Sequence, residues 1–143
     1  MKKIIFLAGS LFYSAMAFAQ EIHKDEVPSI VLNNFKQKFP KAMDVEWELK
    51  NQLYKVEFEI GRKDHEAWIN STGGIVKHKQ DITASELPGE VAASISKSYK
   101  GYRIDDVEKI ESNKKFSYKV ELKTLSKEQE VIFDQSGKLV ETY

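Results

Sequence analysis

Three histidines, His23, His65 and His78, are the only imidazoles of this 143-residue chain, which contains no cysteine. Zinc sites made of these residue types show close spacings such as HExxH or paired cysteines, and neither spacing occurs. In Asp64-His65-Glu66, successive residues of a strand would point to opposite faces of a sheet. We therefore expect no metal site and no cofactor, and we interpret the three histidines as surface residues.

Motifs of nucleophilic and phosphate chemistry are also missing. No serine lies in a GxSxG elbow, and the 7 glycines form no phosphate-binding loop. The segment Asp134-Gln135-Ser136-Gly137 resembles the start of a calcium loop but lacks the later carboxylates. Together with the similar Asn70-Ser71-Thr72-Gly73, it is better interpreted as a hairpin turn in which glycine supplies a positive φ. We expect a protein that is not an enzyme.

A candidate binding patch centres on Trp68 and Ile132. If Ala67 and Ile69 face the core, Trp68 points to the opposite face of its strand, and Ile132 is its counterpart later in the chain. An aromatic anchor inside a polar rim is typical of protein-binding surfaces. We predict binding of an unknown protein partner, in the envelope or outside the cell, by a patch of eight residues: Trp68, Ile132, Lys55, Glu57, Glu66, Lys119, Glu121 and Glu130.

Other interpretations of the same residues stay open. Trp68 and Ile132 could pack against another part of the chain, and a one-residue slip in strand phase would exchange the two faces. A second candidate function is binding of a small ligand or metal ion in a pocket between helix and sheet, lined by Tyr54, Tyr118, Trp47 and the histidines. A third is a housekeeping role in the envelope that depends on neighbouring genes.

The N-terminus has the pattern of a secretory signal peptide. Lys2 and Lys3 precede an apolar stretch, and Ala17-Phe18-Ala19 matches the small-x-small cleavage site. A membrane anchor is the alternative, but the stretch is interrupted and shorter than the roughly 20 residues needed to span a bilayer. We predict cleavage after Ala19, a periplasmic or secreted protein, and no membrane span after cleavage.

The charge balance argues against a nucleic-acid partner. The chain has 22 basic and 22 acidic residues, and loss of Lys2 and Lys3 leaves 20 basic against 22 acidic, a net charge of −2. Nucleic-acid binding requires clustered positive charge, whereas these lysines are interleaved with glutamates. With 41% hydrophobic residues, the chain can bury a core without disulfides. The oligomeric state is not determined by these features.

An internal repeat organises the mature chain. Tyr54 through Lys79 aligns without a gap with Tyr118 through Tyr143, and both segments begin with Tyr-Lys-Val-Glu. We predict a signal peptide over 1–19 and two copies of one supersecondary unit over 20–81 and 82–143. A repeat of this size would be only marginally stable alone, so we expect the two copies to form one compact unit.

Each copy combines a helix pattern with strand patterns. Apolar residues recur at helical spacing, with a proline at each start: Val27, Ile30, Val31, Phe35 and Phe39 in the first copy, and Leu87, Val91, Ile95 and Tyr99 in the second. Segments in which apolar and charged residues alternate follow each helix. In the first copy we expect these apolar residues to face the core: Val45, Trp47, Leu49, Tyr54, Val56 and Phe58. We predict an α+β fold with about four antiparallel strands per copy, a short last strand near Ile75-Val76, and the helices on one face of a curved sheet.

These segments resemble the PepSY-like, beta-lactamase-inhibitor-like (BLIP-like) exported proteins of Bacteroidetes. The resemblance rests on Val27-Pro28, Phe39-Pro40-Lys41-Ala42, Val45-Glu46-Trp47 and Tyr54-Lys55-Val56-Glu57-Phe58, and on the two glycine turns. It implies a helix packed on a curved antiparallel sheet, twice over, with no catalytic residues and an open sheet face that binds protein. The chain departs from the inhibitors in lacking cysteine, and no segment matches their contact residues.

Overall fold

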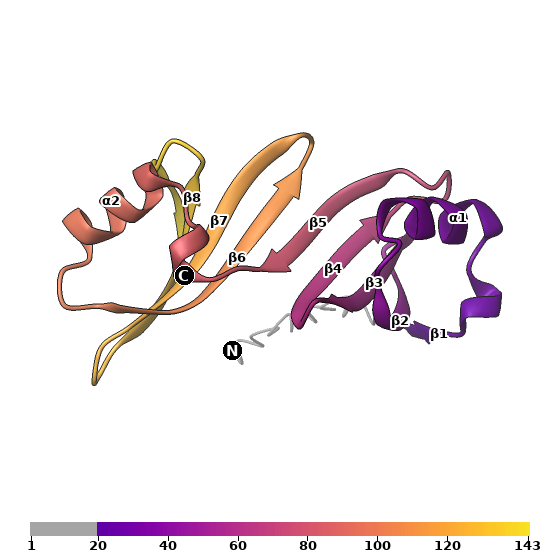
Figure 1. The fold of residues 1–143 in the computed structure, drawn as a ribbon, viewed down its shortest axis with the longest axis horizontal. Coiled ribbons are helices and arrows are strands. Elements are labelled where there is room, and N and C mark those ends of the chain that lie inside the picture. The colour runs from indigo at the N-terminus through magenta and orange to yellow at the C-terminus, as the bar shows by residue number, and fades with distance from the viewer. Residues whose placement is uncertain (1–19) are drawn as a thin grey trace, which may run out of the picture.

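The computed structural model describes residues 20–143, and the predicted signal peptide lies outside this range. Two helices and nine strands follow one another in the order β1 (Gln20–Ile22), α1 (Ser29–Lys38), β2 (Met43–Lys50), β3 (Leu53–Ile60), β4 (Lys63–Ile69), β5 (Ile75–Asp81), α2 (Gly89–Ser98), β6 (Arg103–Ser112), β7 (Lys115–Lys123), β8 (Glu128–Asp134) and β9 (Leu139–Thr142). Short 3-10 helices, η1 (Lys24–Glu26) and η2 (Ala84–Glu86), precede the two α-helices. The strands form one open antiparallel sheet in chain order (Figure 1), so the predicted α+β class is confirmed.

The sheet is continuous across the two repeats. Each repeat consists of one helix and the four strands that follow it, α1 with β2 to β5 and α2 with β6 to β9. Strand β5 extends to Asp81, well beyond the short strand predicted near Ile75-Val76. Its last five residues pair with β6, from Lys77↔Ser112 to Asp81↔Glu108. The repeats are therefore joined side by side through backbone hydrogen bonds.

The first core lies between α1 and strands β2 to β4. Four residues of the predicted helical stripe are buried, and they lie four positions apart in the chain: Val27, Val31, Phe35 and Phe39. Phe35 contacts Trp47 and Phe58 edge to face, with ring centroids 5.2 and 5.0 Å apart. Ile30, predicted to belong to the stripe, is instead 51% exposed, because it lies one residue away from the buried row. The helix therefore covers the sheet as its spacing predicts.

A second and separate core lies under α2. Leu87, Val91 and Ile95 pack against side chains of β6, β7 and β8, of which Val120, Leu122 and Val131 are fully buried. The two buried clusters share no residue. The repeats thus hold a common sheet but not a common core, which makes the molecule elongated (Figure 1).

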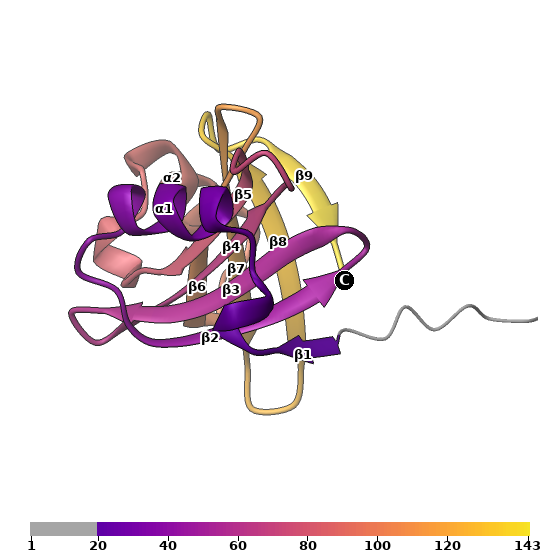
Figure 2. The same cartoon turned by 90° about the vertical axis from the view of Figure 1, so that its right-hand side faces the viewer.

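Both helices cover the same face of the sheet. Phe39 at the end of α1 contacts His78 of β5, and Val107 of β6 lies in the core under α2. The register pairs His78 with Glu111, which lies on the same side of β6 as Val107. Figure 2 shows α1 and α2 on one side, and the strands turning progressively from β2 to β9. The opposite face carries neither of the two described helices, and we call it the open face.

A β-bulge alters the start of β2. Pairing with β3 shifts between Met43 and Glu46, and Asp44 adopts a φ of 49°. The bulge interrupts the alternation, so Val45 is 38% exposed. Leu49, near the other end of the strand, is also partly exposed, and only Trp47 of the three predicted core residues is buried.

The two glycine turns have the predicted hairpin chemistry. Asn70 Oδ1 accepts hydrogen bonds from the backbone N–H groups of Thr72 and Gly74, at 3.1 and 2.8 Å. Asp134 Oδ1 does the same for Ser136 and Lys138, at 2.9 and 3.0 Å. The glycines have φ values of 86° (Gly73) and 81° (Gly137). Each turn therefore ends a strand in the same way in both repeats.

Candidate functional site

A row of alternating charges crosses the open face. It contains one residue from each strand between β2 and β8, in the order Glu48, Lys55, Glu66, Lys79, Glu108, Lys119 and Glu130, and we call it the ion-pair row. Successive nitrogen–oxygen distances along the row are 3.5, 3.7, 3.8, 3.2, 3.2 and 3.0 Å. The row therefore runs through both repeats without a break.

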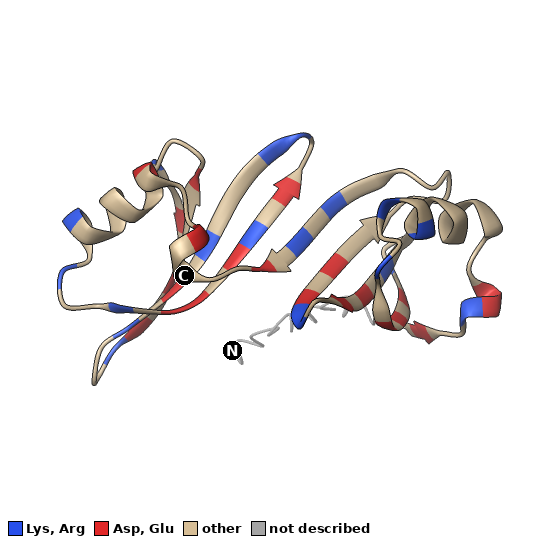
Figure 3. Ribbon diagram, in the orientation of Figure 1, with Lys and Arg blue, Asp and Glu red and all other residues tan. Residues whose placement is uncertain are grey.

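Strand register explains this arrangement. Glu48 lies directly opposite Lys55, Glu66 opposite Lys79, and Glu108 opposite Lys119. The remaining contacts are diagonal, within the reach of a lysine side chain. The result is visible in Figure 3 as positive and negative bands along the strands. Opposite charges at adjacent positions favour this strand alignment.

Two lysines of the row, Lys55 and Lys119, are held in their charged form. Burial by itself would lower the pKa of Lys55, but its hydrogen bond to Glu57 and the carboxylates of Glu66, Glu57 and Glu48 raise the pKa above its ordinary value. Lys119 behaves in the same way, since hydrogen bonds to Glu130 and Glu108 raise its pKa against the effect of burial. The side chains of Lys55 and Glu108 are only 15% and 16% exposed. The charges of the row are thus matched and partly withdrawn from water.

Trp68 and Ile132 lie on the open face, each beside a lysine of the row. Trp68 pairs across the strands with Lys55 and Lys77, and Lys77 Nζ lies 4.8 Å from the centre of its indole ring. Ile132 lies opposite Lys119. Both side chains are half-buried. Ala67 and Ile69 are fully buried on the helix side, so a one-residue slip in strand phase is excluded.

The structure brings all eight predicted patch residues to the open face. Glu57 is hydrogen-bonded to Lys55, and Glu121 forms an ion pair with Lys123. Further residues were not predicted, namely Glu48 of β2, Lys79 of β5, and Glu108 and Ile110 of β6. The alternation in 103–112, where Val107 faces the core, would have placed Glu108 and Ile110 on this face. Lys79 was missed because the last strand of the first repeat was predicted to be short.

Two histidines form a pair on the helix side, so their interpretation as surface residues is wrong. His65 is 8% exposed, and its Nδ1 lies 3.0 Å from Nε2 of His78. The aromatic rings of Phe58 and Phe39 pack against the pair. His65 and His78 face the core because they occupy positions of β4 and β5 in phase with Ala67. His23 is exposed as predicted.

Burial and neighbouring charges keep this pair neutral. Burial is the main cause that lowers the pKa of His78, and electrostatic repulsion from His65, Lys38 and Lys109 lowers it further, to about 4. Burial and Lys63 also lower the pKa of His65. One ring must donate its N–H to the unprotonated nitrogen of the other, which is possible only when at least one imidazole is neutral. The pair therefore behaves as part of the polar core.

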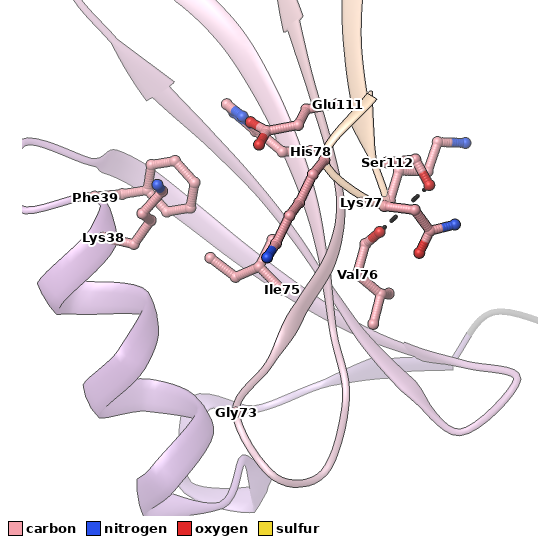
Figure 4. A pocket seen from close by; sticks show the side chains of 11 residues that line it. Lys38, Phe39, Gly73, Ile75, Val76, Lys77, His78, Glu111 and Ser112 are labelled. Carbon is pink, nitrogen blue, oxygen red and sulfur yellow. Dashed lines mark hydrogen bonds between the residues drawn. The ribbon is translucent and has the colours of Figure 1, made fainter. Parts of the chain in front are cut away.

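A hollow of about 510 Å³ lies on the helix side where the repeats meet (Figure 4). The end of α1, strand β5 and the β6–β7 hairpin enclose it, with Phe39 and His78 at one side and Ser112 at the other. Ser112 Oγ donates a hydrogen bond to the carbonyl of Val76 at 3.4 Å. The charged residues of its lining are one glutamate, Glu111, and three lysines, Lys38, Lys77 and Lys114. In residues 20–143 no group of three or more histidine, aspartate or glutamate side chains is placed to hold a metal ion.

The fold and the open face define a class of protein, a tandem helix-and-sheet repeat whose helices leave one face of a continuous sheet uncovered. The chain belongs to the family described as "Putative beta-lactamase-inhibitor-like, PepSY-like", whose family model matches residues 16–77 and 52–141. The resemblance noted from the sequence is therefore confirmed. The comparison with curated proteins finds no match. Neither described helix is long and apolar enough to cross a membrane.

Solved structures from Bacteroides have the same fold. A DUF2874 family protein from Bacteroides uniformis is 21% identical, with a TM-score of 0.72 over 81% of this chain and 88% of that one. A BLIP-like protein from Bacteroides fragilis is 19% identical, with a TM-score of 0.69 over 81% and 84% of the two chains. A protein from Bacteroides eggerthii described as "putative periplasmic" is 16% identical, with a TM-score of 0.73 over 82% and 88%.

Proposed function

We propose that this protein is exported and binds or inhibits another protein of the envelope or the extracellular space through the open face of its sheet, without catalytic activity. The observation that carries the proposal is the uncovered face that spans both repeats, with half-buried Trp68, Ile110 and Ile132 among the charges of the ion-pair row. The family description, inhibitor-like, agrees with a binding role.

The charges of this face favour recognition of a partner with its own alternating charges. Each lysine of the row is shared between glutamates, so a carboxylate of a partner can replace one glutamate while the lysine stays paired. Trp68 supplies a large, rigid apolar surface between Lys55 and Lys77. Complementary charge then contributes mainly to specificity and to the rate of association.

Site-specific photo-crosslinking tests the proposal. A benzoyl-phenylalanine placed at position 68 or 132 and irradiated in the producing cells should give the same discrete protein adduct. Placed at position 30, on the exposed side of α1, it should not give this adduct. Purified partner should then bind the wild-type protein, and Trp68→Ala should weaken binding by roughly tenfold or more.

Matched variants separate the open face from the rest of the surface. Lys119→Glu reverses a charge of the ion-pair row, whereas Lys97→Glu reverses one on α2. We expect the first to weaken binding and the second to leave it unchanged. Adducts that are identical from positions 30, 68 and 132 would contradict the proposal, as would equal effects of the two charge reversals.

A further inference from the structure

A second hollow lies on the helix side of the first repeat, where several side chains differ from their counterparts in the second repeat. It measures about 430 Å³ and lies between α1 and β2, close to η1. Its apolar lining includes Leu32, Phe35, Phe39, Val45 and Trp47. This volume falls in the range of roughly 300–1,000 Å³ that is common for small-molecule sites. The hollow is far in the fold from the open face, since α1 and that face lie on opposite sides of the sheet.

The internal repeat shows why the hollow exists. The two helices have equal length, and the turn after each is closed by an equivalent hydrogen bond, from Ala42 N–H to the Phe39 carbonyl and from Tyr102 N–H to the Tyr99 carbonyl. Ala42 of the first repeat therefore corresponds to Tyr102 of the second. Tyr102 packs on the second core with its ring centroid 6.0 Å from that of Tyr99. An alanine at this position leaves unfilled the space that a tyrosine ring occupies in the other copy. The small side chain of Ala42 thus contributes to the opening in the first repeat.

The charged residues around the hollow also differ between the two repeats. Lys24 and Lys36 line it, together with no acidic residue. Their counterparts in the second repeat are Ala84 and Ser96, which carry no charge. The exposed apolar Val45 corresponds to Asp105, which is paired with Lys123. Pro40, which also lines the hollow, corresponds to Lys100, so the two repeats place their cations differently, and only the first places them at the positions of Lys24 and Lys36.

We infer that this hollow binds a single-tailed amphipathic anion, of the class of a fatty carboxylate. The tail would lie against Phe35, Phe39 and Trp47, and the carboxylate would lie at Lys24 and Lys36. An anion matches the two lysines, and an alkyl chain matches the apolar lining better than a compact polar metabolite does. This site would be an addition to the protein-binding face, and it does not depend on that face.

Calorimetric titration with dodecanoate tests the inference. We expect saturable binding with one site per chain, and much weaker binding of dodecyltrimethylammonium, which has the same tail and the opposite charge. Ala42→Tyr, which copies the second repeat, should weaken dodecanoate binding by about tenfold or more. Lys24→Ala combined with Lys36→Ser, again copied from the second repeat, should weaken it by roughly five- to tenfold.

Control variants keep the result interpretable. Lys38→Ser removes a lysine of the same helix that does not line this hollow and should leave dodecanoate binding unchanged. If Ala42→Tyr does not fold, Val45→Asp places the residue of the second repeat at an already exposed position and should also weaken binding. Absence of saturable binding, equal binding of the cationic and anionic amphiphiles, or full binding by the folded pocket variants would overturn the inference.

Discussion

Lys79 and Glu108 form an ion pair of 3.2 Å that connects the two repeats across the β5–β6 pairing. The two side chains are only 18% and 16% exposed, and each also contacts a neighbour in its own repeat, Glu66 for Lys79 and Lys119 for Glu108. The pair therefore joins the charges of the first repeat to those of the second at the place where their cores do not meet.

Removal of this pair should weaken the connection. Lys79→Met leaves Glu108 half-buried with one cation instead of two, and we expect a loss of roughly 1–2 kcal/mol in the free energy of unfolding. A double-mutant cycle with Glu108→Gln, measured by urea denaturation, should give a favourable coupling energy that decreases in 1 M salt. A coupling energy near zero at low salt would contradict a stabilising role of the pair.

Acid should destabilise the protein through His78. An unfolded histidine titrates near 6.5, whereas the pKa of His78 in the folded protein is lowered to about 4, so the unfolded chain binds more protons between these values. The contribution of His78 is complete above pH 6.5 and is lost as the pH falls toward 4. Allowing for its partial exposure, we expect roughly 1–2 kcal/mol.

Urea denaturation at pH 7 and pH 5 measures this effect. His78→Gln should reduce the difference in stability between the two pH values, and a matching change at the exposed His23 should leave the difference unchanged. An NMR titration in which the His78 ring protonates near 6.5 in the folded protein would refute the explanation.

The glycine turns should tolerate no side chain. A Cβ atom added at Gly137 would clash with the carbonyl oxygen of Glu90 in α2, and the φ of 81° disfavours alanine. We expect Gly137→Ala to destabilise the protein by about 2 kcal/mol or more. Gly89→Ala at the start of α2 meets nothing within 4 Å and should be neutral or slightly stabilising. Thermal unfolding of both variants measures this difference, and equal melting temperatures would contradict the prediction.

Separate cores should allow the repeats to lose stability separately. Val56 and Val120 are equivalent, fully buried residues of the first and second cores. Val56→Ala should lower amide hydrogen-exchange protection mainly in α1 and β2 to β4, and Val120→Ala mainly in α2 and β6 to β8. Equal loss of protection in both repeats from either variant would indicate a single cooperative unit instead.

Local patterns were sufficient for the two α-helices and for the faces of most strand residues. The helical stripe predicted α1 and its buried Val31 and Phe35, and the alternation around Trp68 placed that ring away from the core. These features depend on residues a few positions apart, so sequence spacing determines them. Val45 was placed wrongly because the positive φ of Asp44 interrupts the alternation, which no spacing indicates.

Pairing between distant residues required the tertiary structure. Neither the His65–His78 contact nor the continuity of the ion-pair row follows from a single segment, because each depends on the register of β5 with its neighbours. The hollow beside Ala42 depends likewise on how α1 lies over β2.

By itself, then, the sequence determined a duplicated helix-and-sheet unit with one apolar and one charged side to each strand, because these properties come from short-range periodicity and turn chemistry. Only the tertiary structure decided that β5 joins β6, that the ion-pair row runs through both repeats, and that a hollow lies between α1 and β2. Those outcomes depend on packing and hydrogen bonding between residues far apart in the chain, which local spacing does not encode.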